Sequence, residues 1–171
     1  MNQILGGWTA TGIQTYQSGD PLSIDAGIGA GTYLFNVLGD VRANVISGVP
    51  LKLPSGGTFD YAGGTGQAYL NPAAFAAPPT TPNGVALTLG NSPREFGNLR
   101  GPWQPMENFG FFKRFPFREG MFLEARCDLI NAFNRAGRAD PDTTLSDSTF
   151  GRILDVADGP REVQVALRFT F

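Results

Sequence analysis

The chain has no histidine, one cysteine and few charged residues, and each shortage removes a class of function. Without histidine, the commonest general base and a frequent metal ligand are absent. The single cysteine, Cys127, excludes an internal disulfide and any cysteine-based metal cluster. A net charge of −2 over 171 residues gives no electrostatic reason for nucleic-acid binding. We therefore expect no enzyme, no cofactor and no nucleic-acid partner.

Long apolar runs are also absent, since no segment approaches the roughly 20 apolar residues that a membrane-spanning helix needs. A membrane-spanning strand needs only about 9–11 residues, and half of them can be polar. The 23 glycines and 13 prolines predict strands, turns and loops instead of helices. The opening "MNQILGGWTATG" lacks the basic start and apolar stretch of a secretory signal. We expect any export signal to lie outside this sequence.

Alternation of apolar and polar residues with a period of two is the main pattern that is present. In "MFLEARCDLINAF" the residues Leu123, Ala125 and Cys127 would share one face of a strand, with Glu124 and Arg126 on the other. This separation favours a strand over a helix, although several of these residues are good helix formers. Strands are predicted near residues 8–17, 107–115, 121–133 and 161–171.

The connections between these strands alternate between long and short. A segment rich in Gly, Pro, Asn and Thr, 18–106, is predicted as a long loop, whereas "PFREG" (116–120) is a tight turn. The connection after residue 133 is long again. Outer-membrane barrels have long extracellular loops and short periplasmic turns. The pattern predicts an all-β chain of antiparallel, up-and-down strands from a transmembrane barrel.

Pairing the strands tests this interpretation. A hairpin centred on Arg118 would pair Phe115 with Met121 and Lys113 with Leu123, so that one face is apolar. Lys113 is expected near the membrane edge, with its ammonium reaching the headgroups. Aligning Phe171 with Met121 gives the second register, which sets Arg168 opposite Glu124, Leu167 opposite Ala125 and Gln164 opposite Asp128.

The two registers predict one face toward hydrocarbon and one toward a wet interior. Hydrocarbon contact is expected for Phe109, Leu123, Leu167 and Phe171, and Cys127 would be an inert apolar side chain. On one face of the first strand, Trp8 and Tyr16 lie eight residues apart, which suits two aromatic girdles at the membrane boundaries. The charged residues predicted to face the lumen are Glu124, Arg126, Asp128 and Arg168.

The loop "ADPDTTLSDSTFG" holds Asp140, Asp142 and Asp147, whose oxygens are ligands that Ca²⁺ prefers. Their spacing is not that of the twelve-residue calcium loop, and no glycine stands at its turn. A solvated loop is favoured, and calcium binding stays open.

Six segments, in order, resemble the C-terminal part of TonB-dependent receptors, in particular the Oar-like subgroup that bears a carboxypeptidase regulatory domain. Four internal segments carry the middle of the resemblance: "DVRANVISGVPL", "YLNPAAFAAPP", "FGNLRGPW" and "FFKRFPFREGMFLEARCDLINAFN". The outer segments are "GGWTATGIQTYQSGDPLSI" at the start, and "FGRI" with the closing "GPREVQVALRFTF". On this resemblance, residues 1–171 are the C-terminal part of one barrel domain, with about four strands of an incomplete barrel.

The resemblance implies energised uptake of a bulky solute such as an iron complex, a vitamin or a glycan, at the cell outer membrane. It implies contact with the lipid bilayer, and with the TonB complex through N-terminal regions absent from this sequence; the fragment itself would transport nothing. In that family an alternating, aromatic-ended last strand is the signal for the barrel-assembly machinery. Here that signal would comprise Val163, Val165, Leu167, Phe169 and Phe171.

Two alternatives stay open at this point. A porin-like or adhesive outer-membrane barrel would have the same strands and loops. A soluble, secreted β-sandwich that binds carbohydrate would show the same alternation along each strand.

Overall fold

The computed structural model describes residues 6–29, 40–54 and 66–171. The chain separates into two compact units. The sheet unit comprises Met1–Gln17, Trp103–Gly137 and Asp158–Phe171, and the loop unit comprises Ser18–Pro102 and Arg138–Ala157. In the described residues, no helix is long and apolar enough to span a membrane.

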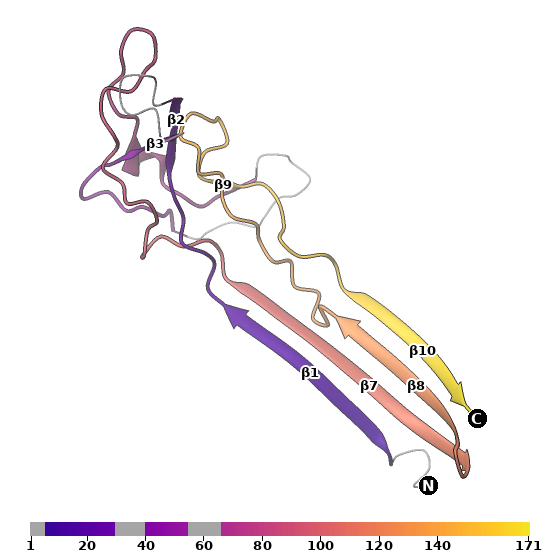
Figure 1. Ribbon diagram of the computed structural model, residues 1–171. Helices are drawn as coiled ribbons and strands as arrows, with labels where there is room; N and C mark the ends of the chain where they lie inside the picture. Colours follow the sequence, from indigo (N-terminus) through magenta and orange to yellow (C-terminus); the bar gives the residue numbers. More distant parts are fainter. Residues whose placement is uncertain (1–5, 30–39, 55–65) are drawn as a thin grey trace. The chain divides into compact units, whose positions relative to one another are not determined.

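The sheet unit consists of antiparallel strands in the order β1-β7-β8-β10 (Figure 1). The all-β, antiparallel fold class is therefore confirmed. Three strands differ from their expected lengths. The second is longer at both ends, and the fourth is one residue shorter at each end. The third stops at Ile130, because Asn131 adopts a positive φ of 49°. The strands are β1 (Trp8–Gln17), β7 (Gln104–Arg118), β8 (Met121–Ile130) and β10 (Glu162–Thr170).

The hairpin between β7 and β8 corrects the predicted register by two residues. Phe115 pairs with Leu123 instead of Met121. The turn is the two-residue stretch after Arg118, in which Gly120 has a φ of 77°, and a β-bulge lies between Pro116 and Arg118. Because the turn is tight, β7 extends to Arg118, and the pairing with β8 is shifted by two residues from the predicted one. Because the shift is even, every side chain keeps its predicted face.

The pairing of β8 with β10 agrees with the predicted register. Arg168 lies opposite Glu124, Leu167 opposite Ala125, and Gln164 opposite Asp128. This register is confirmed at each of these positions. On the other side of the sheet, β1 pairs with β7 from Trp8 opposite Lys113 to Gln17 opposite Gln104.

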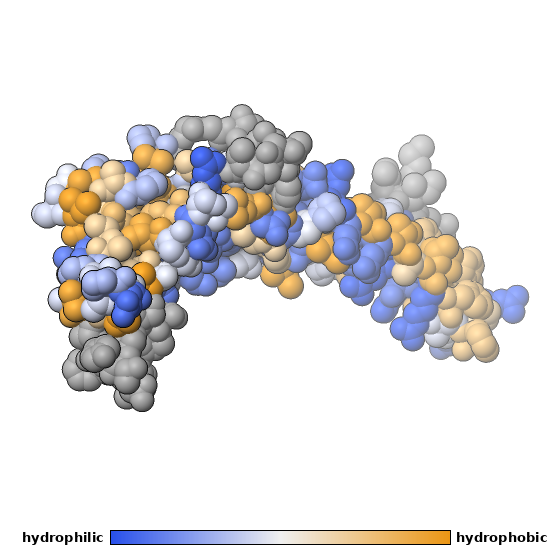
Figure 2. Space-filling view, turned by 90° about the horizontal axis from the view of Figure 1, so that it is seen from above, coloured by the Kyte–Doolittle hydropathy of each residue, from blue (hydrophilic) through white to orange (hydrophobic). Residues whose placement is uncertain are grey.

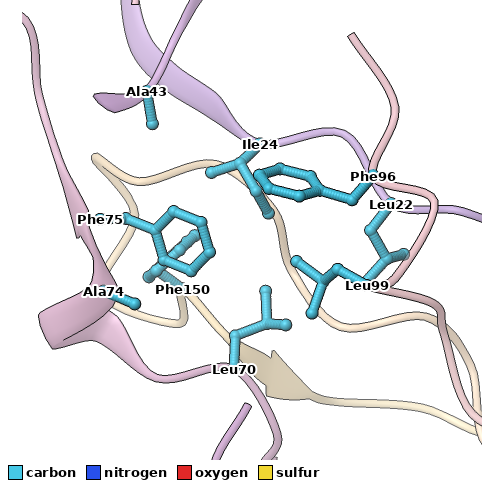
Figure 3. Close-up of a cluster of buried hydrophobic side chains, with 9 residues drawn as sticks. All are labelled: Leu22, Ile24, Ala43, Leu70, Ala74, Phe75, Phe96, Leu99 and Phe150. Atoms are coloured by element: carbon cyan, nitrogen blue, oxygen red, sulfur yellow. The ribbon is translucent and has the colours of Figure 1, made fainter. Parts of the chain in front are cut away.

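The loop unit has its own hydrophobic core, although its sequence predicts only a long loop. Phe75 packs edge-to-face against Phe96 and Phe150, at ring-centroid distances of 6.2 and 5.7 Å. Their side chains gather with Ile24 and Leu70 among the buried residues of Figure 3. The short elements around this core are β2 (Asp25–Gly29), β3 (Asp40–Arg42), β4 (Asn44–Val45), β5 (Gln67–Ala68), η1 (Pro72–Ala74), β6 (Phe75–Ala76) and β9 (Arg152–Ile153).

Pairing between distant segments holds this unit together. Strand β4 pairs with β6, and β5 pairs with β9 across more than eighty residues of sequence. The Gly151 carbonyl accepts the backbone N–H groups of both Tyr69 and Leu70. Asn71 caps η1 by accepting the Ala73 N–H. The segments that leave the sheet therefore form a folded unit.

Candidate functional site

The four-stranded sheet has one apolar and one polar face, set by the alternation of its strands. On the apolar face of β10, Val163, Val165, Leu167, Phe169 and Phe171 are between 51% and 94% exposed. Within the sheet unit, the described residues place no second sheet or helix over this face. Figure 2 shows hydrophobic and hydrophilic residues in separate bands along the strands. A sheet of this kind requires an apolar environment on one side.

The four charged residues predicted to face a lumen lie on the polar face of β8 and β10. Arg126 Nε is 2.6 Å from Asp128 Oδ2, and Arg114 Nε is 2.6 Å from Glu124 Oε2. Glu124 thus pairs with Arg114 of β7, while Arg168 lies opposite it on β10. Arg114 was missed as a partner because the predicted hairpin register set Glu124 opposite Phe112. Opposite charges balance along this face.

A shallow cavity of about 390 Å³ opens on the polar face across all four strands. Thr11, Gly110, Asp128 and Gln164 line it, one from each strand. A Cβ atom at Gly110 would lie 2.8 Å from Thr11 Oγ1 and 2.9 Å from Asp128 Oδ1, so glycine keeps the floor open. Its lining offers both donors and acceptors, which suits a polar solute or a polar segment of protein.

A buried carboxylate interrupts the apolar face near the end of the sheet. Glu107 is fully buried, and Arg135 Nε lies 3.1 Å from its Oε1. The turn after β8 covers it: the Ala132 N–H donates to the Glu107 carbonyl, and Phe133 packs edge-to-face on Phe109 at 5.9 Å. Positive φ angles of 49° and 51° at Asn131 and Asn134 allow this turn. This arrangement was not predicted from the sequence.

Lys113 also interrupts the apolar face, and its position corrects the prediction for this residue. Its side chain is only 3% exposed, and Nζ lies 5.3 Å from the Trp8 ring centroid and 5.0 Å from that of Phe115. The aromatic rings therefore shelter the ammonium by cation–π contacts, in place of the predicted extension to headgroups.

Exposed aromatic side chains lie on the apolar face near both ends of the sheet. Trp8 and Tyr16 stand at either end of β1, as the girdle prediction requires, and their role stays a prediction. Tyr16 stacks on Trp103 with a centroid distance of 5.7 Å and an interplanar angle of 6°. At the other end, the Phe169 ring lies near the rings of Phe117 and Phe171, at ring-centroid distances of 6.4 and 6.1 Å.

The acidic loop and Cys127 are two further features singled out in the sequence. Asp142 accepts the Thr144 N–H and the Thr149 hydroxyl, which orders the acidic loop. In the part of the chain that the structure describes, no three His, Cys, Asp or Glu residues lie together as a metal site. Cys127 is partly buried on the apolar face, between Phe111 and Val165 of the neighbouring strands.

A comparison with protein families identifies this arrangement. The family model described as an outer membrane beta barrel domain matches residues 1–164. The chain belongs to this family. No curated protein and no solved structure matches it. As an outer-membrane barrel domain, the chain lies in the cell outer membrane in contact with the lipid bilayer. This membership disfavours the alternative of a soluble β-sandwich. We assign the apolar face of the sheet to the lipid.

The orientation follows from the connections. In outer-membrane barrels the short turns are periplasmic and the long connections extracellular. The two-residue turn at Gly120 is then periplasmic. The sheet end that carries Tyr16, Glu107 and the Asn131–Arg135 turn is extracellular.

Replacing Arg135 by methionine is expected to lower the free energy of unfolding by about 3–5 kcal/mol, because the Glu107 carboxylate would stay buried without its cation. Urea unfolding of the chain in lipid vesicles, followed by the gel mobility of folded and unfolded forms, measures this loss. The double variant Glu107→Gln/Arg135→Met should recover most of it. An equal loss in both variants would show that the unpaired charge is not the cause.

Asp140 provides a pH-dependent prediction. Burial raises the pKa of Asp140, and the nearby Asp20 carboxylate raises it further. Its contribution to stability is therefore full below the ordinary Asp pKa of about 3.9 and is lost as the pH rises through the higher, folded-state pKa. We expect Asp140→Asn to raise the urea midpoint at pH 7 and to leave it unchanged near pH 3. A midpoint that falls at pH 7, or a Ca²⁺-dependent midpoint lost in the variant, would contradict this interpretation.

Proposed function

We propose that the chain forms the C-terminal part of the barrel wall of a TonB-dependent receptor, which takes up a bulky solute such as an iron complex, a vitamin or a glycan with energy from the TonB complex. The order of its six segments, from "GGWTATG" to the closing "VALRFTF", supports this subgroup within the outer-membrane barrel family. The alternation of long and short connections around β7 and β8 agrees with it.

The polar face would supply a wall for the transport path. Arg114, Arg126 and Arg168 balance Glu124, Asp128 and Glu162 on the polar face, so this part of the wall has no net charge. Four strands are too few to close a barrel, and the sheet by itself encloses no pore. The plug and the contact with TonB would come from other regions of the intact receptor.

The last strand is proposed as the signal that the barrel-assembly machinery binds. The outer edge of β10 has no partner strand among the described residues. It combines backbone donors and acceptors with an exposed apolar face that ends in Phe169 and Phe171. Such an edge suits strand addition to a partner sheet.

Uptake by cells that carry the intact gene, compared with a deletion strain, tests the receptor proposal. Labelled ferric siderophore, cobalamin and maltodextrin would be supplied in turn. Accumulation of one solute should depend on the gene and stop when TonB is deleted or a protonophore is added. Gene-dependent accumulation that persists without energy, together with ion conductance of the purified protein in planar bilayers, would instead indicate a porin-like barrel.

Substitution of Phe171 by alanine tests the assembly role. We expect several-fold less protein in the outer membrane, because the exposed terminal ring would no longer be offered to the assembly machinery. Ile46→Ala, which changes an exposed residue of the loop unit, is the control and should leave the level unchanged. The level is measured by immunoblotting outer-membrane fractions. Equal levels of the Phe171 variant and the wild type would contradict the proposal.

A further inference from the structure

The polar face holds a second cavity beside the one at Gly110, closer to the extracellular end of the sheet. It has a volume of about 160 Å³, and Asp158 and Glu162 are among the residues that line it. Asn108 and Ile130 line both cavities, so the two are adjacent. Together they form one groove on the polar face, which we call the extracellular groove.

Apolar side chains stand on one side of this groove, although the polar face is expected to meet water. Ile13 of β1, Met106 of β7 and Ile130 of β8 are 71%, 43% and 39% exposed. Strand pairing sets Ile13 opposite Asn108 and Met106 opposite Thr15, so both belong to the polar face. Further strands at either edge would extend the sheet in its own plane and would not cover this patch. The patch therefore favours a partner with apolar groups.

The other side of the groove is acidic. Asp158 and Glu162 make no ion pair with any residue that the structure describes. Arg161, which lies between them in the sequence, lines neither cavity. Among the lining residues, Arg126 supplies the positive charge, and its Nε is already bound to Asp128 at 2.6 Å. The groove therefore has an excess of negative charge.

This local excess is consistent with balanced charges over the polar face as a whole. Arg114 is bound to Glu124, and Arg168 lies opposite Glu124, toward the periplasmic end. Glu162 lies opposite Ile130 at the extracellular end. Along β10, Arg168 is therefore roughly 20 Å from Glu162, well beyond the screening length of about 8 Å at physiological salt. The distant arginines do not neutralise the groove.

The two unlike sides of the groove match the two sides of an extended peptide. Successive side chains of an extended chain point in opposite directions. A peptide lying along β7 and β8 would direct alternate side chains to the apolar patch and the others to the acidic side. From Met106 to Gly110 the groove extends for roughly 14 Å, the length of about four extended residues. Asp128 and Gln164 in its floor offer polar partners to the peptide backbone.

We propose that the extracellular groove binds a short peptide in which basic and apolar residues alternate, and that such peptides are a solute class of the receptor. The basic side chains form charge-assisted hydrogen bonds with Asp158 and Glu162, while the apolar ones cover Ile13 and Met106. The acidic side repels an anionic iron complex, and a glycan leaves the apolar patch in water. The role of the peptide as a solute rests on the proposed receptor function, whereas its binding requires neither TonB nor energy.

Fluorescence anisotropy with the full chain in micelles of an uncharged detergent tests this site. The probe is the amidated tetrapeptide Lys-Leu-Lys-Leu with a neutral fluorophore. We expect saturable binding, and at least roughly tenfold weaker binding of Glu-Leu-Glu-Leu and of Lys-Ser-Lys-Ser. Asp158→Asn/Glu162→Gln should weaken binding of the probe roughly fivefold, because two ion pairs are lost. Ile13→Thr should weaken it roughly threefold, because apolar contact is lost.

The matched controls are Glu119→Gln at the periplasmic turn and Ile46→Thr in the loop unit, which change exposed residues outside the groove and should bind as the wild type does. Gel mobility establishes that each variant is folded before it is titrated. The peptide site would be overturned if Glu-Leu-Glu-Leu bound as tightly as the probe, if both groove variants bound as the wild type does, if the controls lost equal affinity, or if maltotetraose displaced the probe. These outcomes do not touch TonB-dependent uptake of another solute, and uptake that needs no TonB would contradict the receptor proposal while leaving peptide binding in place.

Discussion

The pairing of β8 with its two neighbours is the constraint on which the two faces of the sheet depend. A shift of one residue would turn Glu124 and Arg126 toward hydrocarbon and Leu123 and Ala125 toward the polar side. An arginine on the lipid face costs roughly 2–4 kcal/mol at the bilayer midplane. Several such residues lie along these strands, so odd shifts are strongly disfavoured. The cavity at Gly110, the ion pairs and the apolar surface all follow from this choice.

The same reasoning explains which parts of the sheet the sequence could predict. Alternation defines faces, and it does so equally well for registers that differ by two residues. It therefore located the strands and the face of Arg126, but it could not decide whether Phe115 opposes Met121 or Leu123. That choice depends on the turn, where Gly120 adopts a positive φ and a bulge precedes it. No short turn connects β8 to β10, so turn geometry does not shift their register. Placing Glu124 opposite Arg168 was sufficient to predict it.

The loop unit could not be predicted in this way. Phe75, Phe96 and Phe150 come from segments far apart in the sequence, and the strands around them are only two to five residues long. Neither helical nor strand periodicity extends over such short elements. The ion pair of Glu107 could not be predicted from periodicity either, because its cation, Arg135, comes from a turn 28 residues later. The sequence nevertheless contained a signal that Glu107 is unusual. An acidic residue on a mostly apolar face contradicts its surroundings, and such contradictions tend to mark special sites.

The sheltered position of Lys113 has a consequence for how the sheet enters the bilayer. Its ammonium is covered by one ring from its own strand and by Trp8 from β1, a strand separated from it by about a hundred residues of sequence. If β7 entered alone, the Lys113 ammonium would cross hydrocarbon without the Trp8 ring. Insertion is energetically easier when β1 and β7 are already paired, so that the charge crosses inside an aromatic cover. The strands would then enter the bilayer as a preassembled ribbon.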